Sequence, residues 1–101
     1  MENHPTYRLL GLALAYHAQG KKRESDAALL ELISKHSKDS PYQIAEVYAF
    51  REDRDKAFEW LDRAFTMRDG GLTEVKPDPL LNNLRRDPRF AAVLRKMRLP
   101  L

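Results

Sequence analysis

Residues 12–20 read Leu-Ala-Leu-Ala-Tyr-His-Ala-Gln-Gly, and residues 44–52 read Ile-Ala-Glu-Val-Tyr-Ala-Phe-Arg-Glu. The two stretches carry a large aliphatic residue, a small residue and a tyrosine at the same spacing, 32 residues apart. The correspondence continues downstream in the pairs Ser25 and Ala57, Leu29 and Leu61, and Leu32 and Ala64. The correspondence fails at one position, where Gly20 of the first segment is matched by Glu52 of the second. A helical repeat of about 30–35 residues predicts stacked helix hairpins, which bind other molecules more often than they transform them.

Local signals place four helices in the first two-thirds of the chain. A first helix is expected from Pro5 and Thr6 to Gly20, which is a good left-handed terminator. A second helix is expected from Lys22 to about His36. Ser40 is the expected N-cap of a third helix, with Pro41 at its first position and its end near Arg51. The fourth helix is expected over about 55–67, with Asp69-Gly70-Gly71 as its stop.

The last third has a different character. Residues 70–79 predict an irregular connector fixed by Pro77 and Pro79, and residues 80–84 predict a short helix. Asp87-Pro88 is typical of an N-cap followed by proline, which starts a last helix through about Arg98 and before Leu99-Pro100-Leu101. One apolar stripe on that helix consists of Phe90, Val93, Leu94 and Met97. The sequence predicts an all-α fold without strands.

Composition limits the class of protein. The chain has 101 residues, of which 43% are hydrophobic and 33% charged, as expected of one small globular domain. It contains no cysteine, which excludes disulfides and thiolate metal sites. No apolar stretch reaches about 18 residues, and the N-terminus lacks a signal-peptide pattern, so we expect a cytoplasmic protein. The net charge of +3 divides into −2 for residues 1–75 and +5 for residues 76–101.

The two segments resemble tetratricopeptide repeats, with a period of 32 residues instead of about 34. In repeat one the matching residues are Leu9, Leu12, Ala13, Tyr16, Gly20, Ser25 and Leu29. In repeat two they are Ile44, Ala45, Tyr48, Ala57, Leu61 and Ala64. The resemblance implies one domain over 1–101: repeat one at about 6–38, repeat two at about 39–69, and a connector and cap at about 70–101. Residues 78–90 are similar to the closing segment of bacterial tetratricopeptide proteins, and the cap is expected to cover Phe58, Trp60 and Phe65.

The resemblance also implies a ligand groove along the first helices of the repeats. By position its partner-binding residues are Tyr7, Leu10, Leu14, His17, Gln43, Glu46 and Phe50. Most of this set is apolar or aromatic, which favours a protein or peptide partner with hydrophobic anchors. The alternative is that these residues only pack the hairpins together. The first helix is apolar nearly all round, which predicts either a homodimer or partner surface, or extra burial within the chain itself.

No catalytic constellation is present, and we expect no catalytic residue, cofactor or metal. His4, His17 and His36 are scattered and form no metal-binding motif. We therefore expect a non-catalytic module for protein–protein interaction or scaffolding, located in the cytoplasm of a bacterium. The alternative is the C-terminal regulatory module of a larger bacterial kinase, cyclase or transcription regulator. A third hypothesis, nucleic-acid binding through Arg85, Arg86 and Arg89, lacks an accompanying motif.

Overall fold

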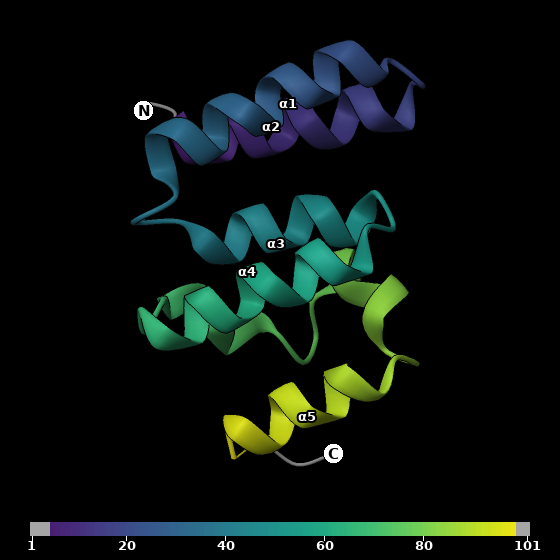
Figure 1. The fold of residues 1–101 in the computed structure, drawn as a ribbon. Helices are drawn as coiled ribbons and strands as arrows, with labels where there is room; N and C mark the ends of the chain where they lie inside the picture. Colours follow the sequence, from purple (N-terminus) through teal and green to yellow (C-terminus); the bar gives the residue numbers. More distant parts are fainter. Residues whose placement is uncertain (1–4, 99–101) are drawn as a thin grey trace.

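The protein is described by a computed structural model over residues 5–98. Its regular secondary structure there is helical, without strands, which confirms the predicted all-α class. The α-helices are α1 (Pro5–Ala18), α2 (Lys22–His36), α3 (Pro41–Phe50), α4 (Arg54–Thr66) and α5 (Pro88–Lys96). Two 3-10 helices, η1 (Gly70–Glu74) and η2 (Pro79–Leu84), connect α4 to α5. Figure 1 shows α1 beside α2, α3 beside α4, and α5 at the far end of the molecule from α1 and α2.

The turns of the two hairpins have the same backbone geometry. Gly20, two residues after the end of α1, has a positive φ of 75°. Glu52, two residues after the end of α3, has a positive φ of 62°. The amide of Lys21 donates to Tyr16 at 2.8 Å, and the amide of Asp53 donates to Tyr48 at 2.9 Å. The 32-residue offset found in the sequence therefore also relates two left-handed helix stops in the structure.

Small residues allow the paired helices to approach closely. Ala13 and Ser25 in the first hairpin, and Ala45 and Ala57 in the second, are all completely buried. The Ser25 hydroxyl donates to the carbonyl oxygen of Ala13 at 2.8 Å, so the one polar member of this set has a partner. This bond places Ala13 and Ser25 at the contact between α1 and α2.

Two predicted helix signals act differently in the structure. The Ser40 side chain does not cap α3; its hydroxyl lies 3.2 Å from that of Thr6, and Asp69 instead accepts the Tyr42 amide at 3.0 Å. A carboxylate is a stronger acceptor than a hydroxyl, and the chain brings Asp69 to the start of α3. The predicted glycine stop of α4 was also wrong. α4 ends at Thr66 with Arg68 at φ 57°, and Gly70 and Gly71 belong to η1.

The C-terminal segment contacts two of the three aromatic residues that the predicted cap was expected to cover, since Arg89 lies over Phe58 and Lys96 over Phe65. Phe58 and Trp60 are buried and Phe65 is half-buried. Phe90 and Leu94 of α5 are buried, and Val93 and Met97 pack against the core.

Charged side chains reinforce the contact between α4 and α5. Arg89 bonds Asp55 at 2.9 Å and lies 4.5 Å from the Phe58 ring centre. Lys96 pairs with Asp62 and lies 4.7 Å from the Phe65 ring centre. Arg89 and Lys96 therefore each make both an ion pair and a cation–π contact with α4.

Some sequence features lie outside the described residues, namely His4 and the expected helix stop at Leu99-Pro100-Leu101. Over residues 5–98, none of the helices has the length and apolar character that crossing a membrane requires.

Replacing Glu52 by glycine should stabilise the protein by about 1 kcal/mol, because a side chain in the left-handed region is strained. Gly20→Ala is the matched change in the other hairpin and should destabilise by a similar amount, since a Cβ there meets no neighbouring atom within 4 Å and only the backbone is strained. Urea denaturation of both variants measures the two values. Equal effects of the same sign would contradict the equivalence of the turns.

Candidate functional site, an acidic groove beside the first and third helices

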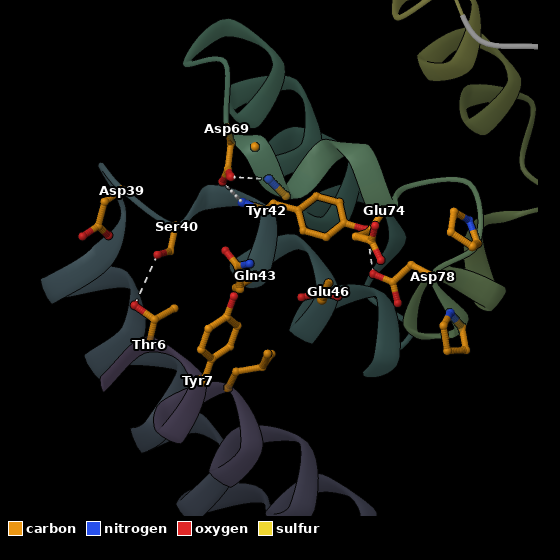
Figure 2. Close-up of a pocket in the computed structure, with 15 residues that line it drawn as sticks. Thr6, Tyr7, Asp39, Ser40, Tyr42, Gln43, Glu46, Asp69, Glu74 and Asp78 are labelled. Atoms are coloured by element: carbon orange, nitrogen blue, oxygen red, sulfur yellow. Dashed lines mark hydrogen bonds between the residues drawn. The ribbon is translucent and has the colours of Figure 1, made fainter. Parts of the chain in front are cut away.

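A groove of about 680 Å³ lies where the N-terminal parts of α1 and α3 meet the segment 69–79. Its lining residues come from three separate parts of the chain (Figure 2). They are Thr6, Tyr7, Leu10, Asp39, Ser40, Tyr42, Gln43, Glu46, Asp69, Gly70, Gly71, Glu74, Pro77, Asp78 and Pro79. In Figure 2 the Tyr7 ring extends from α1 toward Gln43, with Glu74 and Asp78 on the other side of the groove.

The groove is acidic. Five of its lining residues carry carboxyl groups: Asp39, Glu46, Asp69, Glu74 and Asp78. Within residues 5–98, no lysine, arginine or histidine lines the groove. Like charges that share a concave surface reinforce one another, so the groove carries a negative potential that attracts cations.

Asp69 fixes one end of the groove. Its carboxylate accepts the Tyr42 amide at 3.0 Å and the Gly71 amide at 2.8 Å, and so satisfies the starts of both α3 and η1. Gly71 lies directly against the Tyr42 side chain. A Cβ at position 71 would lie 2.8 Å from Tyr42 Cδ2, whereas a Cβ on Gly70 would meet nothing within 4 Å. This contact places η1 against the ring that forms the groove floor.

Asp78 fixes the other end. It is 7% exposed, accepts the Tyr42 hydroxyl at 2.6 Å and caps η2 by accepting the Leu80 amide at 2.9 Å. Arg85 donates to the Asp78 carbonyl oxygen at 2.7 Å, which holds the same residue from its backbone. Tyr42, which is 1% exposed, therefore connects α3 to both connector segments.

Glu46 and Asp78 form a buried carboxyl pair in which one group is protonated and the other ionised. Burial and the hydrogen bond to Asp78 raise the pKa of Glu46 to about 9. Despite burial, hydrogen bonds from Glu46 and Tyr42 keep the pKa of Asp78 below its ordinary value. At neutral pH Glu46 is protonated and donates to the ionised Asp78. Burial, followed by the Asp78 contact, also raises the pKa of Tyr42, so that its hydroxyl remains a donor.

Four of the seven residues predicted to bind a partner line this groove: Tyr7, Leu10, Gln43 and Glu46. The other three lie elsewhere. His17 and Phe50 contact each other with ring centres 5.7 Å apart, and Leu14 packs against the core. The groove also differs in character from the expected apolar surface, because the connector contributes Asp69, Glu74 and Asp78 to it.

The apolar first helix is largely accounted for by packing within the chain. Leu9 and Ala13 are buried, and Leu10, Leu12 and Leu14 pack against the core. Among the described residues of this hairpin, the exposed large apolar side chains are Tyr7 at 62% and Leu30 at 65%. Self-association through the first helix stays a prediction.

The basic C-terminal residues make contacts within the chain. Arg85 donates to the carbonyl oxygens of Lys76 and Asp78, and Arg89 pairs with Asp55 and Asp87. These guanidinium groups therefore have internal acceptors, which weakens the case for phosphate binding by the set Arg85, Arg86 and Arg89.

The sequence reasoning missed the three connector carboxyl groups. Asp78-Pro79 has the same pattern as Asp87-Pro88, which was correctly identified as an N-cap, so the signal was present in the sequence. Among residues 5–98, no group of three or more histidine, aspartate or glutamate side chains is arranged to hold a metal ion.

Comparisons with protein-family models, with curated proteins and with solved structures found no match.

Folding stability should fall as the pH rises from about 4.5 to about 9, because the folded protein keeps a proton on Glu46 that the unfolded chain loses near 4.5. Glu46→Gln retains a donor toward Asp78 but does not titrate, so the stability of the variant relative to the native protein should rise by up to about 4 kcal/mol between pH 5 and pH 8. Urea denaturation at both pH values measures this. Glu59→Gln, an exposed change on α4, is the control. Parallel pH profiles for Glu46→Gln and the native protein would contradict a buried neutral Glu46.

Proposed function

We propose that this protein is a non-catalytic protein–protein interaction module that binds a partner segment in the acidic groove. The groove itself carries the proposal: three parts of the chain build it, and Tyr7 presents an aromatic ring that is 62% exposed at its rim. Aromatic residues beside polar groups are frequent anchors at protein interfaces. The volume of about 680 Å³ suits a few side chains of an extended segment.

The hairpins are proposed to be tetratricopeptide-like repeats closed by the segment from η1 to α5. The equivalent left-handed turns at Gly20 and Glu52 support this, as do the small residues at the helix contacts. In such arrays the first helices of the repeats supply the binding face. Here α1 and α3 contribute Tyr7, Leu10, Gln43 and Glu46 to one groove.

A photo-crosslinking residue in place of Tyr7 tests the proposal in extracts of the source cells. Leu30 is the matched control, because it is apolar and 65% exposed but does not line the groove. We expect discrete adducts with partner proteins from position 7 and fewer, different adducts from position 30. Covalent dimers from position 7 would identify a second copy of the chain as the partner.

The same adducts from both positions, or none from position 7, would contradict a partner site in the groove. The adducts are identified by mass spectrometry after purification under denaturing conditions.

A further inference from the structure

We infer that the groove recognises an arginine side chain of the partner protein. This inference rests on the proposed function, since it names the group that enters the same groove. Its basis is charge complementarity inside a cavity: Asp39, Asp69, Glu74 and Asp78, together with the protonated Glu46, line about 680 Å³ of space, and no cationic residue among residues 5–98 lines it. An aromatic ring at the rim adds an independent feature of the site.

The carboxyl groups divide into those that hold the fold and those that remain for a ligand. Asp69 and Asp78 use their oxygens for the starts of α3, η1 and η2. Glu74 is exposed, and its side chain makes no hydrogen bond or ion pair within residues 5–98. Asp39 is exposed at the opposite side of the groove, and its carboxylate lies 3.4 Å from His36 Nδ1. Glu74 and Asp39 therefore provide the most accessible negative charge.

The groove fits a guanidinium better than an ammonium group. A guanidinium is flat, stacks on aromatic rings and donates several hydrogen bonds in one plane. Tyr7 supplies the exposed ring, and carboxylates near the groove walls supply acceptors for paired hydrogen bonds. Leu10, Pro77 and Pro79 add apolar surface for the methylene stem of the same side chain. Each of these features matches one part of an arginine residue.

The probe is the capped pentapeptide acetyl-Ala-Leu-Arg-Leu-Ala-amide, titrated into the isotope-labelled full chain and followed by NMR. Its matched partner carries citrulline in place of arginine and has the same shape without the charge. We expect saturable shifts of the Tyr42 and Gly71 amide signals with the arginine peptide. The citrulline peptide should bind at least about tenfold more weakly, because the ionic contact is lost.

Two protein variants make the test specific to the groove. Glu74→Gln should weaken binding of the arginine peptide about threefold, since it removes one exposed groove charge. Glu24→Gln removes an equal charge from the exposed start of α2, outside the groove, and should leave the affinity unchanged. Tyr7→Leu should weaken the arginine peptide more than the citrulline peptide, because stacking with a cation is lost.

Three results would overturn the inference. Equal affinity for the citrulline peptide would show that charge is not recognised, and equal losses in Glu24→Gln and Glu74→Gln would assign the effect to net charge. A response to free spermidine as strong as that to the peptide would identify a general cation site. If crosslinking from position 7 still yields partners in any of these cases, the interaction function stands and only the arginine assignment fails.

Discussion

The hydrogen bond from the Tyr42 hydroxyl to Asp78 connects α3 to the segment that follows the second hairpin. The Tyr42 side chain is completely buried. The Asp78 carboxylate that accepts its hydroxyl also caps η2 and accepts a hydrogen bond from Glu46. The amide of Tyr42 is held by Asp69, so one residue of α3 meets the connector at both its backbone and its side-chain tip. The position of η1 and η2 relative to α3, and with it the far wall of the groove, depends on this residue.

The acidity of the groove follows partly from the way its helices begin. Aspartate is a favoured N-cap, and two of the groove carboxylates, Asp69 and Asp78, cap 3-10 helices within the wall. Three short segments that start near one place therefore concentrate negative charge there without any catalytic requirement. A partner that neutralises this charge would also relieve repulsion among the carboxylates, so binding and fold stability are expected to be linked.

The sequence predicted the helices well because their signals are local. Apolar spacing and left-handed turn residues act over a few positions, and α1 to α5 lie close to their expected bounds. The groove depended on contacts across 27 residues, from Asp69 to Tyr42, and 36 residues, from Asp78 to Tyr42. No spacing rule predicts such pairs. Glu46 was assigned to the groove by its position in α3, but its buried protonated state depends on Asp78 and was not predictable from α3 alone.

The manner in which α5 is attached has a consequence for dynamics. Alongside the burial of Phe90 and Leu94, α5 is held by the exposed ion pairs Arg89–Asp55 and Lys96–Asp62. Screening by salt weakens such pairs, whereas the buried bonds around Tyr42 are shielded from it. α5 is thus more suited than the segment around Tyr42 to open as a local unit, with earlier amide exchange. Because no residue of α5 lines the groove, such opening leaves the recognition surface intact.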